Sequence, residues 1–227
     1  MTHMLEELFR QHGTLQKVKK QTIVLYQSEV PRRAFMVKKG LVRAYVITSG
    51  GEERTVALHS SGDIIPLSWL LGKTSASLFY YDTLVDSEIY AASKPDVAPS
   101  MTHEPALMAE LLALTTNEHT SLLLRITALE QPNAAEKIAL TMHYLLFQYG
   151  KESTPGFFTI DVRLTQSLIA SLVGLTREST AINLKALKEK GIITYSNFTY
   201  IVNKSRLERF VGEDSFKNAL ETTDQQP

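Results

Sequence analysis

The sequence predicts an α+β protein with a mostly β N-terminal part, one long helix, and a C-terminal part built from short helices and hairpins. Three observations support this fold class. Short β-branched and aromatic runs fill residues 18–95. Apolar residues then recur at helical spacing from Pro105 to Leu129. Beyond Pro132, two apolar runs flank Gly174, and two strand-like runs follow them.

The N-terminal part reads as short strands separated by turn residues. Lys38-Lys39-Gly40 and Ser49-Gly50-Gly51-Glu52 are suited to turns with positive φ. The strands recur about every ten residues, which is typical of an antiparallel sandwich or roll. We therefore expect residues 1–103 to form an antiparallel, jelly-roll-like β-roll. The predicted strands are TIVLY, AFMV, LVRAYVI, RTVALH, SLFYY and SEIYA.

The composition limits the chemistry that the chain can perform. Lysine plus arginine equals aspartate plus glutamate, 24 of each, so the whole chain carries no excess charge that would indicate a polyanion partner. There is no cysteine, which excludes disulfides, cysteine-ligated zinc and iron-sulfur clusters. No apolar run reaches 18 residues and the start of the chain is polar, so we expect a cytoplasmic protein with no membrane partner.

The long helical stretch has an apolar face that needs a partner. Leu107, Leu112, Leu114 and Leu123 widen this face beyond what a single contact would cover. One side can lie on the β-roll while the other pairs with a second copy of the helix. An ordinary core helix is the alternative, and we favour the dimer helix, with its hinge, over residues 104–131. Its stripe comprises Met108, Leu111, Thr115, Glu118, Leu122, Ile126 and Leu129.

The pattern after residue 132 predicts a helix-turn-helix within a domain spanning 132–227. Thr165 or its neighbour can cap a first helix that Gly174 ends in a left-handed turn. Thr176 can cap a second helix that ends before Gly191. Ile169, Ala170 and Val173 would pack against Leu175, Leu184 and Leu187, the packing of two crossed helices. A helical hairpin with no nucleic-acid role would show the same core.

The first turn of the second helix favours DNA recognition over a purely structural role. It reads Arg177, Glu178, Ser179, Thr180. In the major groove arginine donates to guanine, glutamate accepts from cytosine, and serine or threonine can contact either. Glu178 has an alternative role, because a carboxylate is favoured at any helix N-terminus. From residue 163 to residue 209 we count eight basic and three acidic residues, about five net positive charges on one segment.

The segment after Gly191 predicts a small hairpin that would act as a wing. IITYS and TYIV flank Asn197-Phe198, and Ser196, Asn197 or Thr199 would touch the DNA backbone. Lys185 or Lys188, further along the second helix, would lie near a phosphate. The candidate DNA-contacting residues are Thr165, Gln166, Thr176, Arg177, Glu178, Ser179, Ile182, Lys185 and Asn197.

Four segments are specific in combination: VKKGLVRAYVITSGGEERTVALHSSGD, LTQSLIASLVGLTREST, LKALKEKGII and IVNKSRLERF. Taken together, they resemble the Crp/Fnr family of bacterial transcription regulators over nearly the whole chain. The resemblance implies a cyclic-nucleotide-binding-like β-roll, a dimer helix, a hinge, and a winged helix-turn-helix that reads a two-fold-symmetric site. One departure lies in the second helix, where Ile182 stands in place of an arginine that reads guanine in relatives. Isoleucine cannot donate a hydrogen bond, so it would contact a thymine methyl or simply pack.

The second departure concerns the sensor. In cyclic-AMP-binding members an Arg-Ser pair holds the phosphate, and the resemblance puts Ser77 and Leu78 roughly at that place. No arginine occurs between Arg54 and Arg125. A buried phosphate without a cationic partner would be poorly compensated, so we do not expect cyclic nucleotide binding. Haem, another small ligand or no ligand remain open. The candidate pocket residues are Gly62, Asp63, Leu67, Trp69, Ser77 and Leu78.

We therefore expect a homodimeric, sequence-specific DNA-binding regulator. Its partners would be double-stranded DNA, a second copy of the chain and RNA polymerase. The sequence carries no recognisable signature of a surface that contacts the polymerase. A sensing or interaction module that has lost DNA binding is the alternative, with Ile182 as its clue. Catalysis is not expected, because His59, Ser60 and Asp63 lie too close along one strand and turn to form a triad. No histidines stand at metal-ligand spacing, and the role of His119 on the long helix stays open.

Overall fold

The computed structural model of the chain describes residues 3–212. Residues 1–2 and 213–227, which the predicted domains include, lie outside the described residues. The chain forms two compact units, residues 1–117 and residues 118–227. Each unit is described by itself below.

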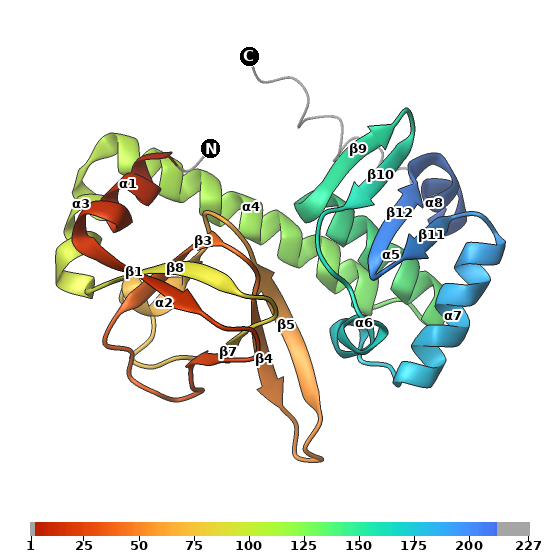
Figure 1. Cartoon of the computed structure of the whole chain (residues 1–227), viewed down its shortest axis with the longest axis horizontal. Coiled ribbons are helices and arrows are strands. Elements are labelled where there is room, and N and C mark those ends of the chain that lie inside the picture. The colour runs from red at the N-terminus through yellow and green to blue at the C-terminus, as the bar shows by residue number, and fades with distance from the viewer. Residues whose placement is uncertain (1–2, 213–227) are drawn as a thin grey trace. The chain divides into compact units, whose positions relative to one another are not determined.

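The first unit contains a sandwich of two four-stranded sheets, which confirms the predicted antiparallel β-roll (Figure 1). One sheet has the order β1 (Gly13–Val18), β8 (Ser87–Ala92), β3 (Ala34–Lys39), β6 (Ile64–Ile65). The other has the order β2 (Ile23–Leu25), β7 (Tyr80–Thr83), β4 (Val42–Ile47), β5 (Glu53–His59). All six predicted runs contribute strands, whereas β1 and β6 were not predicted. The buried residues between the sheets are Leu25, Val37, Val42, Ala44, Ile65, Tyr81 and Ile89.

Three helices that the sequence analysis did not predict build a second core in the first unit. They are α1 (His3–His12), α2 (Leu67–Leu70) and α3 (Lys94–His103). Glu110 fixes the start of α1, because its carboxylate accepts hydrogen bonds from the backbone N–H of Met4 (3.0 and 3.1 Å) and of Leu5 (2.8 Å). Those amides have no partner within the helix, so the carboxylate both caps them and complements the helix dipole.

Helix α4 (Pro105–Leu129) has the predicted bounds, but the residues of the predicted stripe do not all lie on its exposed side. Leu111 was placed on the dimer stripe, yet it is buried in the second core with Leu107 and Leu114. Apolar spacing alone could not tell which side of the helix faces its own domain. Of the remaining stripe residues, Glu118 and Leu129 are partly buried, and Thr115 is exposed with His119. The large apolar residues that stay 46% to 67% exposed are Met108, Leu112, Leu122, Leu123 and Ile126.

The second unit packs helices against one small antiparallel sheet with the strand order β11, β12, β10, β9 (Figure 1). Helix α5 contributes ten buried residues, and the Asn133 side chain caps it by accepting a hydrogen bond from Glu136 N–H at 2.8 Å. The elements are α5 (Ala134–Tyr149), β9 (Gly150–Thr154), β10 (Phe157–Ile160), α6 (Gln166–Val173), α7 (Arg177–Glu189), β11 (Ile193–Ser196), β12 (Thr199–Asn203) and α8 (Lys204–Val211).

The helix break lies at the predicted hinge, since α4 ends at Leu129 and α5 begins at Ala134. The boundary between the two compact units falls earlier, between Asn117 and Glu118, within α4. The division into segments 1–103, 104–131 and 132–227 therefore stays a prediction. Over residues 3–212, no helix combines the length and apolarity that a membrane span requires.

Candidate nucleic-acid interface

Helices α6 and α7 begin and end where the sequence predicts. The Thr165 hydroxyl accepts a hydrogen bond from Leu168 N–H, and the Thr176 hydroxyl accepts one from Ser179 N–H, both at 3.1 Å. Gly174 has φ 70° and ψ 30°, the left-handed conformation that ends α6. The two caps and the glycine turn confirm the predicted helix-turn-helix.

The core between these helices fixes which side of α7 faces outward. Ile169, Val173, Leu184 and Leu187 are fully buried. Thr180, which the sequence analysis placed among the base-reading residues, is also fully buried and donates to the Thr176 carbonyl at 2.9 Å. It precedes Leu184 by four residues and Leu187 by seven, so it lies on the buried side of the helix. We therefore remove Thr180 from the residues that could meet DNA.

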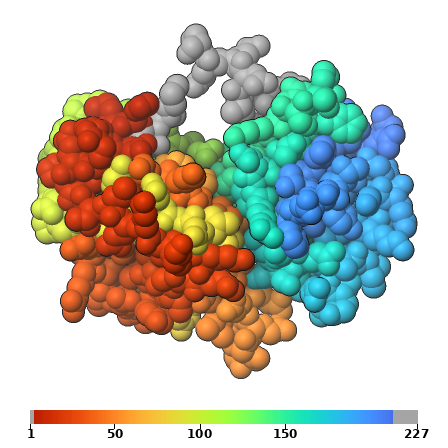
Figure 2. Space-filling view, viewed as in Figure 1, coloured from red at the N-terminus to blue at the C-terminus, as the bar shows by residue number. Residues whose placement is uncertain are grey.

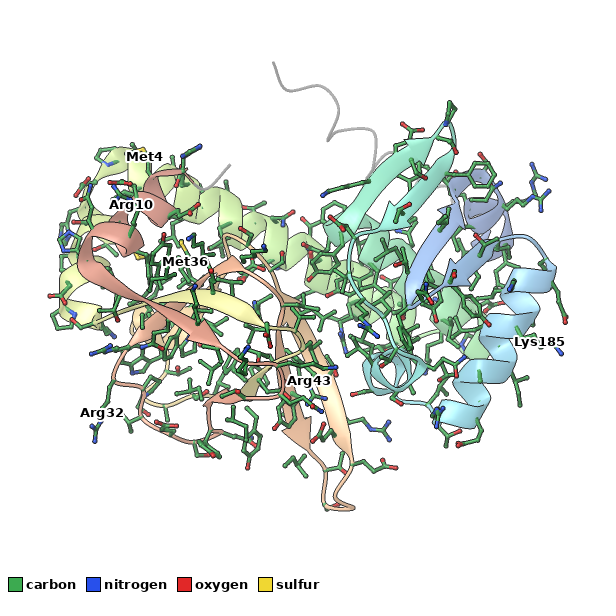
Figure 3. The ribbon with its side chains drawn as sticks, viewed as in Figure 1. Met4, Arg10, Arg32, Met36, Arg43 and Lys185 are labelled. Atoms are coloured by element: carbon green, nitrogen blue, oxygen red, sulfur yellow. The ribbon has the colours of Figure 1, made fainter. Side chains whose placement is uncertain are left out.

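Four of the candidate residues are exposed: Arg177 at the start of α7, and Glu178, Ile182 and Lys185 on the side away from the buried residues. Lys185 projects away from the unit (Figure 3). Ile182 is 69% exposed, so it does not pack within the unit, which was one of its two predicted roles. In the space-filling view the residues of α7, in light blue, lie at the surface of the second unit (Figure 2).

A hollow of about 340 Å³ lies where the starts of α6 and α7 meet the β11–β12 turn. Four candidate residues line it together: Thr165, Gln166, Arg177 and Asn197. Sequence reasoning missed the other lining residues, because their spacing along the chain does not reveal that the turn folds back beside α6. These are Ser167, Tyr195, Phe198 and Tyr200.

The wing is a tight hairpin with aromatic side chains held by cations. Asn197 and Phe198 both have positive φ, 48° and 67°, as the two-residue hairpin turn requires. Tyr195 stacks on Tyr200 with ring centroids 5.0 Å apart, and burial raises the pKa of Tyr200 to about 12. Arg163 lies over the Phe198 ring at 4.5 Å. Basic groups and flat rings therefore stand side by side on the edge of the hollow.

The predicted ligand-pocket residues lie in different surroundings within the first unit. Leu67 and Trp69 pack with the core around α1 and α3, and Lys94 Nζ lies 5.3 Å from the Trp69 ring centre. The Asp63 carboxylate accepts a hydrogen bond from Ser60 N–H at 2.7 Å, just after Gly62. The Ser77 hydroxyl donates to the Phe79 carbonyl at 2.7 Å, whereas Leu78 is half exposed.

No metal site emerges from the described part of the chain. Within residues 3–212, no three histidine, aspartate or glutamate side chains are grouped so that they could hold a metal ion. The candidate sites among the described residues are the exposed residues of α7 with the hollow beside them, and the predicted pocket residues of the β-roll.

Two family models match the chain, one on each unit. The model of the cyclic nucleotide-binding domain matches residues 15–102, and the model of the Crp-like helix-turn-helix domain matches residues 137–210. The first range covers most of β1 and all of β2 to β8, and the second covers most of α5, the sheet, α6, α7 and most of α8. The match therefore agrees with both the fold and the site described above.

Named relatives agree with the models. The regulatory protein HlyX of Actinobacillus pleuropneumoniae is 26% identical over 190 residues, which are 82% of this chain and 77% of the relative. The cyclic AMP receptor protein of Thermus thermophilus is 26% identical over 186 residues, 81% of each chain. The structure of FixK2 from Bradyrhizobium japonicum has a TM-score of 0.72 at 20% identity and covers 87% of this chain and 96% of its own. The chain belongs to the Crp/Fnr family of DNA-binding transcription regulators.

Proposed function

We propose that two copies of the chain, paired along the exposed side of α4, bind a two-fold-symmetric DNA site. One α7 would enter the major groove of each half-site, and the half-sites would be about one helical turn, roughly 34 Å, apart. RNA polymerase would be the further partner. The bound dimer would either contact the polymerase or block its binding site on the DNA.

The single observation that carries this proposal is the exposed start of α7. Arg177, Glu178 and Ile182 lie on the first half of a helix whose other side is fixed in the core. Arginine and glutamate there can exchange hydrogen bonds with base edges, and an exposed isoleucine can cover a thymine methyl. A single exposed isoleucine is common on protein surfaces, so Ile182 supports the proposal only together with the exposed Arg177 and Glu178 beside it.

Phosphate contacts would come from the hollow beside α7. Its rim combines the starts of two helices, where backbone N–H groups favour anions, with the Arg177, Gln166 and Asn197 side chains. Lys185 is exposed, and within residues 3–212 its one ion pair is a long one with Glu189, 3.9 Å, so it is available for a phosphate. These groups would position α7, and the base contacts would supply sequence preference.

Pairing through α4 is proposed from its exposed apolar side chains. Met108, Leu112, Leu122 and Ile126 recur along one side of a 25-residue helix. Thr115 and His119 interrupt this stripe, but the apolar residues on either side of them are buried when the helix packs against a second copy of itself. The break between Leu129 and Ala134 would then let an effector change the distance between the two recognition helices.

Selection of binding sites from random duplex DNA, followed by fluorescence anisotropy on the selected duplex, tests the function. We expect an inverted repeat, with affinity that falls steeply as salt concentration rises. Arg177→Ala should relax preference at one base position, and Lys185→Ala should weaken all sequences alike and reduce the salt slope by about one. The matched control is Lys151→Ala on β9, the edge strand farthest from β11 in the sheet.

Two outcomes would count against the proposal. If Arg177→Ala and Lys185→Ala both bound DNA like the control, α7 would not be the recognition helix. If selection returned no enriched motif, the result would favour the alternative function, a sensing or interaction module that has lost DNA binding. Ile182 in place of the family's arginine is the feature that suggests this alternative.

A further inference from the structure

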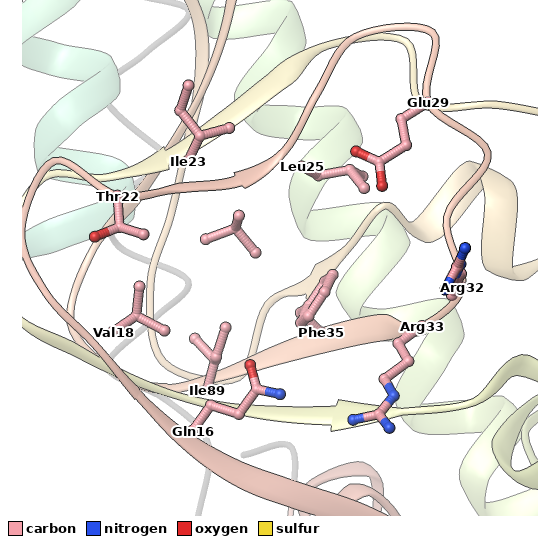
Figure 4. Close-up of a pocket in the computed structure, with 11 residues that line it drawn as sticks. Gln16, Val18, Thr22, Ile23, Leu25, Glu29, Arg32, Arg33, Phe35 and Ile89 are labelled. Carbon is pink, nitrogen blue, oxygen red and sulfur yellow. The ribbon is translucent and has the colours of Figure 1, made fainter.

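Another hollow lies in the β-roll of the first unit, and no part of the DNA-binding proposal uses it. It measures about 400 Å³ and is lined by residues of β1, β2, β3 and β8 and of the β2–β3 loop (Figure 4). Strand β1 is at one edge of its sheet and β2 is at one edge of the other, so the hollow lies where the sandwich is open on one side. We call this hollow the roll mouth. Its volume falls within the usual range for small-molecule sites, roughly 300–1,000 Å³.

The floor of the roll mouth is apolar. Leu25 and Ile89 are buried core residues whose side chains reach the hollow, and Val18 and Phe35 flank them as partly buried residues. Gln16 and Thr22 add polar groups at the sides (Figure 4). An apolar floor with a few polar groups around it is typical of sites that hold a small organic molecule by its hydrocarbon part.

Two adjacent arginines stand at one end of the roll mouth. Arg32 and Arg33 come from the β2–β3 loop, and Arg32 projects into solvent at the rim (Figure 3, Figure 4). Neither forms an ion pair with any residue in the range 3–212, and Arg33 Nη1 makes one hydrogen bond, to the Thr14 hydroxyl at 3.3 Å.

The other arginines of the first unit behave differently. Arg10 pairs with Glu7, Arg54 pairs with Glu52, and Arg43 makes two hydrogen bonds to Asp82, 2.9 and 2.7 Å, as well as an ion pair with Glu53 at 2.8 Å. The two arginines of this unit without an acidic partner among the described residues therefore line the same hollow.

The charge around the roll mouth indicates how much negative charge an occupant would carry. Glu29 also lines the hollow, but its Oε2 accepts a hydrogen bond from Tyr26 N–H at 3.1 Å and so holds the loop. Two guanidinium groups and one carboxylate leave one net positive charge. That balance favours a singly charged anion over a doubly charged phosphate, and a guanidinium matches the two oxygens of a carboxylate.

We propose that the roll mouth binds a small amphiphilic carboxylate, with its apolar body on Leu25, Phe35 and Ile89 and its carboxylate between Arg32 and Arg33. This site shares no residue with the Gly62–Leu78 segment in which the effector pocket was predicted from sequence. It is also independent of DNA binding, so the two proposals can fail separately.

Isothermal titration calorimetry on the full-length chain tests the site with three probes: 4-phenylbutyrate, its uncharged amide, and phenyl phosphate at pH 8. We expect the carboxylate to bind at least ten-fold more tightly than the amide and more tightly than the phosphate. The double variant Arg32→Gln/Arg33→Gln should remove that ten-fold preference. Arg54→Gln, which removes an arginine of the same unit outside the hollow, should leave the affinity unchanged.

A second experiment tests location rather than charge. In methyl-labelled protein, 4-phenylbutyrate should shift the Ile89 and Leu25 methyl signals, and Val18→Phe, which fills the hollow, should abolish binding of both carboxylate and amide. Equal affinity for carboxylate and amide, an unchanged affinity in the double arginine variant, or no binding of any probe at millimolar concentration would overturn the proposal.

Discussion

Arg125 Nη2 donates a hydrogen bond to the Leu172 carbonyl at 3.0 Å, which joins α4 to the last turn of α6. Arg125 is only 8% exposed, and burial lowers the pKa of its guanidinium, which the charge interaction and then the hydrogen bond with Tyr144 partly offset. The last carbonyls of a helix have no partner within it and carry partial negative charge. A cation from the proposed dimer helix therefore holds the end of the helix that precedes the recognition helix.

Replacing Arg125 by Met should destabilise the second unit by about 1–3 kcal/mol. Methionine keeps most of the apolar stem but leaves the Leu172 carbonyl buried without this donor. Urea unfolding followed by circular dichroism measures the change. Arg209→Met on the exposed side of α8 is the control and should stay within about 0.5 kcal/mol of the parent. A variant as stable as this control would mean that the hydrogen bond to Leu172 contributes nothing net.

Leu112→Glu and Leu122→Glu should each shift the protein from dimer to monomer. Both leucines are exposed within one chain, so the glutamates should leave its own fold intact. Each would place two like charges in the proposed seam between copies. Sedimentation equilibrium measures the shift, and Ala113→Glu, on an exposed side of α4 away from the stripe, should remain dimeric. Pairing through this side of α4 is excluded if all three variants have the mass of the parent.

Ile182→Arg should change which base the protein prefers, whereas Ile182→Ala should weaken preference at the same position. The guanidinium can donate two hydrogen bonds to guanine, a discrimination of about 1–3 kcal/mol. Loss of a thymine methyl contact should cost less. Site selection on both variants is the measurement, with Glu189→Ala near the end of the same helix as control. An unchanged motif in both variants would show that Ile182 reads no base.

The sequence predicted those features that local chemistry determines. Thr165, Gly174 and Thr176 act through bonds to residues three or four positions away, so their spacing alone was sufficient. Features that depend on distant segments were not predictable. Glu110 caps α1 across more than a hundred residues, and the burial of Leu111 depends on which side of α4 meets that core. The hollow beside α7 needs a hairpin turn to return to α6, and the roll mouth needs two edge strands to meet.

Cyclic AMP should not bind, although one named relative is a cyclic AMP receptor protein. No arginine occurs between Arg54 and Arg125, and the Ser77 hydroxyl already donates to the Phe79 carbonyl. A phosphate buried in that segment would lack a cation. Calorimetry with cyclic AMP should therefore show no binding below millimolar concentration. A micromolar dissociation constant would contradict this prediction and would mean that cations elsewhere in the unit bind the phosphate.

His59 and Asp63 should give opposite contributions to the pH dependence of stability. Burial lowers the pKa of His59 from 6.5 to about 4, so its contribution is present above pH 6.5 and is lost as the pH falls through about 4. Burial raises the pKa of Asp63 from 3.8 to about 6, more than the Ser60 hydrogen bond lowers it. Its contribution is present below pH 3.8 and is lost as the pH rises through about 6.

Between about pH 4 and pH 6 the two contributions should nearly cancel in the parent, and single substitutions should separate them. Relative to the parent, Asp63→Asn should lose stability as the pH falls from 6 to 4, and His59→Phe should gain it, each by up to about 1.4 kcal/mol per pH unit. Urea unfolding at steps of half a pH unit gives the difference in unfolding free energy between the parent and each variant. The contributions of the other titrating groups cancel in these differences. Parallel curves for the parent and both variants would mean that neither group changes its proton affinity on folding, because a shifted pKa must appear as a slope.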